Sequence, residues 1–263
     1  MSDPPSRNKV TKFWIVRETM LDHDALLAKV RKLLAKAEDP AVTEAEAESY
    51  NTKAAQLIAR YGIDRAMLAA AGTSADEITT IKISLDNPYS RDKAGLLTNI
   101  AHPLRCRALL HRWGQTVTAV SVFGFRSDLE RVELLFTSLL LQATTQLTRV
   151  RPVNAFRGES LAAYRRTWLH GFAGAVHVRL QKSEANATQE HGASQTGGQS
   201  AELVLRDRNA LVKDAYDDQF GNLQTAPPRR LSGSGYLDGH VAGERANLGT
   251  TGLRGGRAAI PAR

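Results

Sequence analysis

The sequence feature that most constrains the fold is a long, mostly apolar stretch over residues 127–150, SDLERVELLFTSLLLQATTQLTRV. Ser127 followed by Glu130 has the spacing of a capping box, which predicts that a helix begins here, and Pro152 ends it. Apolar residues then recur at helical spacing over more than one face: Leu129, Val132, Leu135, Phe136, Leu139, Leu140, Leu141, Ala143 and Leu147. We therefore expect a helix that is covered on several sides and organises the core.

The remaining composition favours a cytoplasmic protein with a sizeable core. A chain of 263 residues is long enough for one or two domains. No window approaches the roughly 18 to 20 consecutive apolar residues that span a bilayer, and the N-terminus MSDPPSRNKV lacks the layout of a signal peptide. Cys106 is the single cysteine, which excludes an internal disulfide and a multi-cysteine metal site. We expect Cys106 to be a buried structural thiol.

The N-terminal quarter predicts a loose arm followed by a helical module. Residues 1–20 contain two prolines and few apolar positions, so we expect them to form a flexible arm. Residues 21–72 show two amphipathic helices, the second starting at a Thr43–Glu46 capping box and stopping at Gly62 in a left-handed C-terminal cap. A short third helix, DRAMLAAAG, is expected to pack across the pair, and the module is expected to fold independently.

The same residues carry a resemblance to a known family. KVRKLLAKAED followed by TEAEAESYNTKAAQLIARYGID resembles the domain of unknown function 2786, found in phage, plasmid and actinobacterial proteins. The segment that follows resembles the uncharacterised second module that often accompanies this domain. The resemblance implies a protein of phage or mobile-element type, and it implies no activity.

Residues 75–182 predict an α+β module in which a small antiparallel sheet packs against two or three long helices. EITTIKISL has the alternation of a strand, and Asn87-Pro88 leads into a helix that ends near His102-Pro103. Two further strands flank the Gly114 turn, and the late helix is SLAAYRRTWLHGFAGAVHVRLQ. Beyond the module we expect a polar linker or frayed helix end at 183–200, a helical segment at 201–225 and a flexible Gly/Arg-rich tail at 226–263.

Motifs for catalysis or metal binding are not found in the sequence. His170 and His177 lie two helical turns apart, too far for one metal ion, and no H-E-x-x-H or G-x-S-x-G pattern occurs. Arg105 and Arg107 are expected to point away from the face of a strand that Cys106 occupies. The stretch GSGYLDGHVAG superficially resembles a phosphate-binding loop but follows no strand. The sequence therefore predicts no catalytic residue, no metal site and no cofactor.

Charge points instead to a polyanionic partner. The formal net charge is +8 and the sequence pI is about 9.8, with the excess spread thinly along the chain. Two helix faces are candidate phosphate-binding surfaces, although each could be an ordinary solvated face. The first comprises Lys29, Lys32, Lys36, Lys53 and Arg60, and the second Arg165, Arg166 and His170.

We expect a nucleic-acid-binding accessory or regulatory protein without a membrane segment. Binding would go through phosphates on one of the two basic faces. One alternative is a protein-interaction adaptor without catalytic activity, which predicts an exposed apolar patch and binding insensitive to salt. A second alternative is a divergent hydrolase or nuclease, which would need polar residues converging in a pocket.

Overall fold

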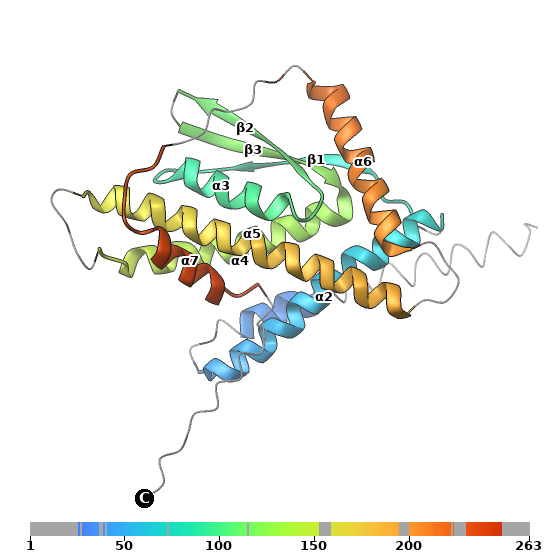
Figure 1. The fold of residues 1–263 in the computed structure, drawn as a ribbon, viewed down its shortest axis with the longest axis horizontal. Coiled ribbons are helices and arrows are strands. Elements are labelled where there is room, and N and C mark those ends of the chain that lie inside the picture. The colour runs from blue at the N-terminus through green and yellow to red at the C-terminus, as the bar shows by residue number, and fades with distance from the viewer. Residues whose placement is uncertain are drawn as a thin grey trace, which may run out of the picture.

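The fold of the chain, seen in a computed structural model, is a three-stranded sheet packed against long helices (Figure 1). This confirms the predicted α+β class. The structure describes residues 26, 28–36, 39, 41–72, 74–114, 116–152, 159–194, 200–221, 223 and 230–248. The arm predicted at residues 1–20 lies outside them. No helix among these residues is long and apolar enough to cross a membrane.

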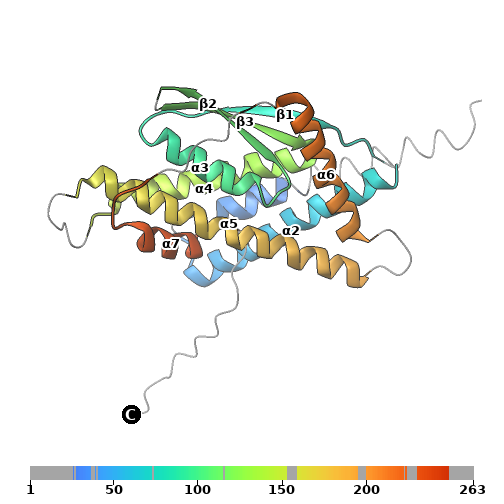
Figure 2. The ribbon, with the colours of Figure 1, turned by 45° about the horizontal axis from the view of Figure 1, so that its top comes forward.

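The sheet consists of β1 (Ile78–Ser84), β2 (Arg107–Trp113) and β3 (Thr116–Phe125) in the order β1-β3-β2, with both pairings antiparallel. Its two faces differ because side chains alternate along each strand. Val120 and Val122 of β3 face α3 (Ser90–Ala101) and α4 (Arg126–Arg149), while Phe123 and Phe125 face α6 (Ala201–Phe220). Figure 2 shows α3 and α4 beneath the sheet and α6 across one end of it.

Helix α4 has the organising role that its periodicity predicts. Its buried apolar residues belong to one cluster that also contains residues of α2 (Glu44–Ala70), α3, α5 (Leu161–Ser194) and the sheet. The buried apolar positions on α4 are Leu129, Val132, Leu135, Phe136, Leu139, Ala143 and Leu147. Leu141 is 55% exposed, so one side of the helix faces solvent. Val30 and Ile58 of the predicted N-terminal module lie in the same cluster, so the two predicted modules share one core.

The start of α4 differs from the predicted capping box. The helix begins one residue earlier, at Arg126, and no side chain of its own caps it. Asp76, which precedes β1, replaces the cap: its carboxylate accepts hydrogen bonds from the Ser127 amide (3.2 Å) and hydroxyl (2.7 Å). Glu130 instead accepts a hydrogen bond from the Tyr61 hydroxyl at 2.6 Å. The prediction was wrong because tertiary partners took over both side chains.

Helix α2 contradicts the predicted stop at Gly62. The Thr43–Glu46 capping box is present, but the helix continues through Gly62 to Ala70 and includes the segment predicted as a third helix. A Cβ atom at Gly62 would overlap the guanidinium of Arg131 on α4. The glycine is therefore explained by a close helix–side chain approach and not by a left-handed cap.

Helix α5 likewise runs through most of the segment predicted as a linker, since it ends at Ser194. Glu184, in that segment, is buried and pairs with Arg105 (3.1 Å) and with Arg131. Arg105 precedes β2 with a left-handed backbone (φ 62°), so the expectation that it lies in a strand beside Cys106 was also wrong. The polar composition of 183–194 thus reflects one buried carboxylate and a solvated face.

A buried ion network links these elements. The carboxylate of Asp128 lies 3.0 Å from Arg105, 3.0 Å from Arg131 and 3.5 Å from Arg208. Arg208 of α6 also donates a 2.7 Å hydrogen bond to Asp76. Each charge has an opposite partner, as buried charges require. The network therefore connects α4, α5, α6, the segment before β1 and the segment before β2.

Part of the predicted flexible tail forms α7 (Tyr236–Arg245), which packs on α5. Gly171 of α5 and Gly239 of α7 allow the close approach, because a Cβ at either would overlap backbone of the other helix. Gly171 therefore admits α7 as a close neighbour of α5. At the C-terminus of α7, Arg179 donates hydrogen bonds to the carbonyls of Gly243 (2.8 Å) and Ala246 (2.5 Å). Gly235, Gly239 and Gly243, spaced four residues apart, form a face that packs on α5. The prediction of a flexible chain was therefore wrong for this segment.

We expect Gly239→Ala to lower the free energy of unfolding by about 1–3 kcal/mol, because the added methyl overlaps the Trp168 carbonyl. Gly95→Ala is the matched control, since Gly95 is also helical and has nothing within 4 Å of its Cβ position. That variant should gain about 0.5–1 kcal/mol. Urea denaturation of both measures the difference. Equal and small effects would show that α7 does not pack closely on α5.

Candidate anion-binding site

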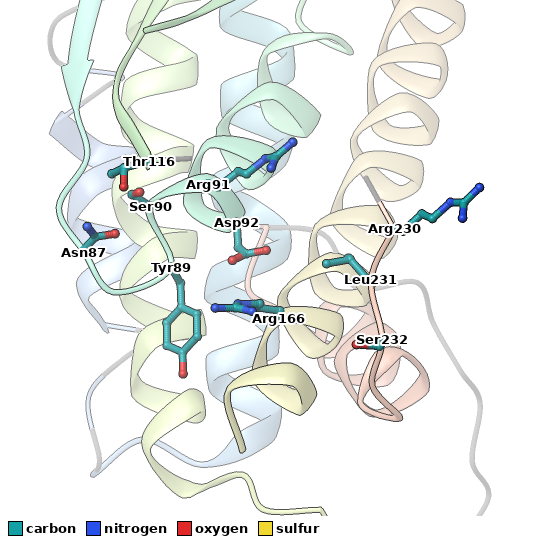
Figure 3. A pocket seen from close by; sticks show the side chains of 10 residues that line it. All are labelled: Asn87, Tyr89, Ser90, Arg91, Asp92, Thr116, Arg166, Arg230, Leu231 and Ser232. Atoms are coloured by element: carbon teal, nitrogen blue, oxygen red, sulfur yellow. The ribbon is translucent and has the colours of Figure 1, made fainter. Parts of the chain in front are cut away.

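A polar cavity of about 550 Å³ lies where the N-terminal ends of α3 and α5 meet the chain that leads into α7 (Figure 3). The cavity is open to solvent on one side. Its lining comes from the β1–α3 connection, the first turn of α3, the start of β3, the second turn of α5 and the segment before α7. The lining residues are Asn87, Tyr89, Ser90, Arg91, Asp92, Thr116, Arg166, Arg230, Leu231 and Ser232.

Three arginines from three separate segments contribute to this lining. Arg166 extends from α5 toward Asp92 and Tyr89, whereas Arg91 and Arg230 extend away from Tyr89 (Figure 3). Guanidinium groups bind phosphate through paired N–H donors and keep their charge at any physiological pH. Arg166 therefore brings positive charge toward Asp92 and Tyr89, and Arg91 and Arg230 add to the positive charge around the cavity.

The helix ends add to that positive potential. The first turn of α3 has no side-chain cap, and the carbonyl of Tyr89 accepts the amides of Asp92 and Lys93, both at 2.9 Å. Helix α5 has no acidic residue in its first turn. Amide groups at a helix start carry partial positive charge, so acids are favoured there and arginines are not. The first turn of α3 holds a favoured acid, Asp92, next to Arg91.

Asp92 gives the cavity one acceptor among these donors. Asp92 is 7% exposed, and its position in the first turn of α3 suits the helix dipole. The ring of Tyr89 lies beside it (Figure 3). Tyr89 has a left-handed backbone (φ 66°), which costs a non-glycine residue about 1–2 kcal/mol. The cavity thus combines guanidinium donors with a carboxylate and an aromatic side chain.

Hydrogen bonds around the start of α7 position the wall that carries Arg230. Glu159 accepts from the amide (2.7 Å) and hydroxyl (2.8 Å) of Ser234. Thr167 accepts from the Gly235 amide at 3.1 Å. Tyr164 donates a 2.5 Å hydrogen bond to Asp238, and burial together with that carboxylate raises the pKa of Tyr164 to about 12. The packing of α7 on α5 therefore determines where Arg230 lies.

The two basic faces predicted from the sequence lie on different parts of the molecule (Figures 1 and 2). Of the second face, Arg166 lines the cavity, Arg165 is half-buried and His170 is exposed beside Tyr236. The first face is exposed, none of its residues lines this cavity, and it is away from the α5 N-terminus. There Lys36 lies 5.5 Å from the Tyr50 ring centroid and Arg60 pairs with Asp64 at 3.4 Å, while Lys29, Lys32 and Lys53 are exposed.

Sequence reasoning missed Arg91, Asp92 and Arg230. A signal existed for two of them. Arg91 follows a turn at Asn87-Pro88 and occupies a first helical turn, where a cation is unfavourable without an anion. Arg230 belongs to the Pro227-Pro228-Arg229-Arg230 run, whose importance appears only when α7 folds back onto α5. Neither signal says that the two arginines line one cavity with Arg166.

The other chemical candidates occupy structural positions. Cys106 is buried, and burial raises the pKa of its thiol far above the usual range. The Nδ1 atom of His177 lies 3.0 Å from the carbonyl oxygen of Asn99. The stretch GSGYLDGHVAG contributes to α7. Within the described ranges, no group of three His, Cys, Asp or Glu side chains is placed to hold a metal ion.

Comparison with known proteins identifies one part of the chain. Residues 25–65 match the family described as protein of unknown function (DUF2786). The match covers the helix over residues 26–36 and the larger part of α2, and it supports the resemblance found in the sequence. No curated protein and no solved structure matches the chain.

Proposed function

We propose that this protein binds nucleic acid through its phosphates, as a cytoplasmic accessory or regulatory factor of phage or mobile-element type. The observation that carries the proposal is one cavity whose lining includes Arg91, Arg166 and Arg230, with Arg166 extending toward Tyr89 and Asp92 (Figure 3). Phosphate contacts supply most of the sequence-independent affinity for nucleic acid. The formal charge of +8 favours the same partner at long range.

The arginine cavity is a better supported contact surface than the N-terminal lysines. Lysines on an exposed helix face are the default for a solvated surface, and Arg60 already has an acidic partner. Arg166 instead joins two arginines from distant segments around a concave site. A concave site lined by three arginines and one carboxylate carries a net positive charge, which favours an anionic ligand.

The salt dependence of binding distinguishes the two surfaces. We expect Arg166→Ala to reduce the slope of log affinity against log salt by roughly 0.7–0.9, because each phosphate contact releases one counterion. The triple variant Lys29→Ala, Lys32→Ala and Lys36→Ala should leave the slope close to that of the unmodified protein. Fluorescence anisotropy with labelled single-stranded and duplex oligonucleotides across a salt series measures both.

Arg206→Ala is the matched control, since Arg206 is an exposed arginine on α6, a helix that contributes no residue to the cavity lining. The slope of log affinity against log salt for Arg206→Ala should equal that of the unmodified protein. A slope lowered by the lysine variant and unchanged by Arg166→Ala would move the contact surface to the N-terminal helices. Circular dichroism of each variant checks that the fold is retained.

A second candidate function, the protein-interaction adaptor, is supported by one observation on α7. Tyr236, Leu237 and Val241 are 43%, 73% and 44% exposed, and the last two lie one turn apart on the same helix face. Exposed apolar side chains grouped in this way are typical of interaction surfaces. The adaptor predicts a partner whose binding is insensitive to salt and is lost in Leu237→Asp, whereas nucleic-acid binding predicts steep salt dependence.

A further inference from the structure

We infer that the arginine cavity receives the phosphorylated terminal nucleotide of a single strand rather than the side of a duplex. The inference rests on the proposed function and specifies which part of the nucleic acid binds in the cavity. Three properties of the cavity carry it: its size, its mixture of donors and acceptors, and the aromatic ring in its wall.

The size of the cavity fits a small ligand. Its volume of about 550 Å³ lies within the range of roughly 300–1,000 Å³ that holds small molecules in proteins. A surface that tracks a duplex backbone needs contacts spread along successive phosphates, not one concave site. A concave site into which one arginine, Arg166, extends is instead suited to holding one phosphate group, and the end of a strand offers such a group.

The donors and acceptors in the cavity match a nucleotide better than a simple anion. An inorganic phosphate accepts hydrogen bonds from arginine, but its negative charge would be repelled by the carboxylate of Asp92. A nucleotide also carries donors, the sugar hydroxyls and the amino groups of the base, which a carboxylate binds. A carboxylate has about four acceptor positions, so Asp92 can serve a ligand as well as a protein partner.

The side chain of Tyr89 adds an aromatic element beside the charged ones. It lies next to Asp92 and Arg166 at the cavity (Figure 3). Single-stranded nucleic acid is bound by stacking bases on aromatic rings next to basic groups, and a base is free to stack only where it is unpaired. A terminal nucleotide in a single strand satisfies this condition and also brings its phosphate to the arginines.

A circular oligonucleotide provides the sharpest comparison, because it carries the same bases and phosphates as a linear one but has no end. We expect a linear, 5′-phosphorylated single strand to bind the full chain about ten- to a hundredfold more tightly than its circular form. This is the effect of losing one or more charge-assisted hydrogen bonds. Strands phosphorylated only at the 3′ end, and strands without terminal phosphate, show which end the cavity takes.

Two variants connect that preference to the cavity. Arg166→Ala and Asp92→Asn should each reduce the ratio between linear and circular affinity, whereas the α6 control Arg206→Ala should keep it. A nucleoside monophosphate should displace the linear strand at lower concentration than inorganic phosphate does. Circular dichroism confirms that each variant is folded.

The outcomes separate the inference from the proposed function. Equal, salt-sensitive binding of circular and linear strands would overturn the terminal-nucleotide site and leave nucleic-acid binding in place. A preference for ends that survives in Arg166→Ala would overturn the assignment to this cavity. Failure to bind either strand, with the nucleoside monophosphate also failing to bind, would overturn both proposals.

Discussion

Replacing Asp128 by alanine is expected to lower the free energy of unfolding by about 3–5 kcal/mol, because it leaves buried charges without their partner. The Asp128 side chain is 2% exposed and lies between the guanidiniums of Arg105, Arg131 and Arg208. Arg131 is fully buried and keeps only Glu184 as a counter-charge in the variant. The loss should affect every element that the network joins.

Urea denaturation followed by circular dichroism measures this effect. Asp218→Ala is the control, because Asp218 is exposed on α6, and surface changes of this kind usually stay within about 0.5 kcal/mol. If Asp128→Ala cost no more than the control, the network would contribute nothing to stability and its burial would need another explanation.

The same network makes stability depend on acid pH. Burial alone would raise the pKa of Asp128, but the three neighbouring guanidiniums outweigh it and hold the pKa below its usual range. A lowered pKa in the folded state stabilises the protein above the unfolded value of about 3.9, and this contribution is lost as the pH falls through the folded value. We therefore expect the unmodified protein to lose stability below about pH 4 more steeply than Asp128→Ala does.

Replacing Phe136 by alanine should cost about 3–5 kcal/mol, because it removes a large side chain from the core and leaves a cavity. Phe136 is 4% exposed and belongs to the cluster that joins α4 to the other helices and the sheet. Glu133, one turn earlier on the exposed face, is the control. Glu133→Ala should change stability by less than about 0.5 kcal/mol.

Thermal and urea unfolding of both variants provide the measurement. A shift in the urea midpoint without a change in slope would show that Phe136→Ala lowers stability and leaves the surface exposed on unfolding unchanged. Equally mild effects for Phe136 and Glu133 would place α4 at the periphery and contradict its central role.

Periodicity in the sequence predicted the elements whose apolar faces are continuous. The stripe on α4 from Leu129 to Leu147, the strand at 78–84 and the hairpin around Gly114 follow from local spacing of apolar residues. Such patterns report which residues leave water, and burial of those residues dominates the stability of the fold. The α+β class could therefore be predicted from the sequence alone.

Features that depend on residues distant in the chain could not be predicted in the same way. The sequence near Arg131 contains only one of the partners of this fully buried residue, Asp128, because the other, Glu184, lies on α5. Gly62 has the appearance of a helix stop, and only the position of Arg131 explains its place inside α2. Asp76 as the cap of α4 is a third case. Each results from a tertiary contact that overrides a local preference.

The residues of the candidate site likewise include one that local sequence predicted and others that it did not. Arg166 was found because it lies on an amphipathic helix whose exposed face is basic, whereas Arg91 and Arg230 were not found because each is isolated in its own segment. The cavity exists only where α3, α5 and the chain before α7 meet. Local charge patterns identify a candidate residue of this kind, and the fold determines whether it has companions.

The affinity of the unmodified protein for a 5′-phosphorylated single strand at low ionic strength tests the central claim most directly, since electrostatic attraction is greatest there. We predict binding that weakens steeply as salt is added, by fluorescence anisotropy of the labelled strand. The absence of any binding to DNA or RNA under these conditions would contradict the claim, and the adaptor would then become the better account of this protein.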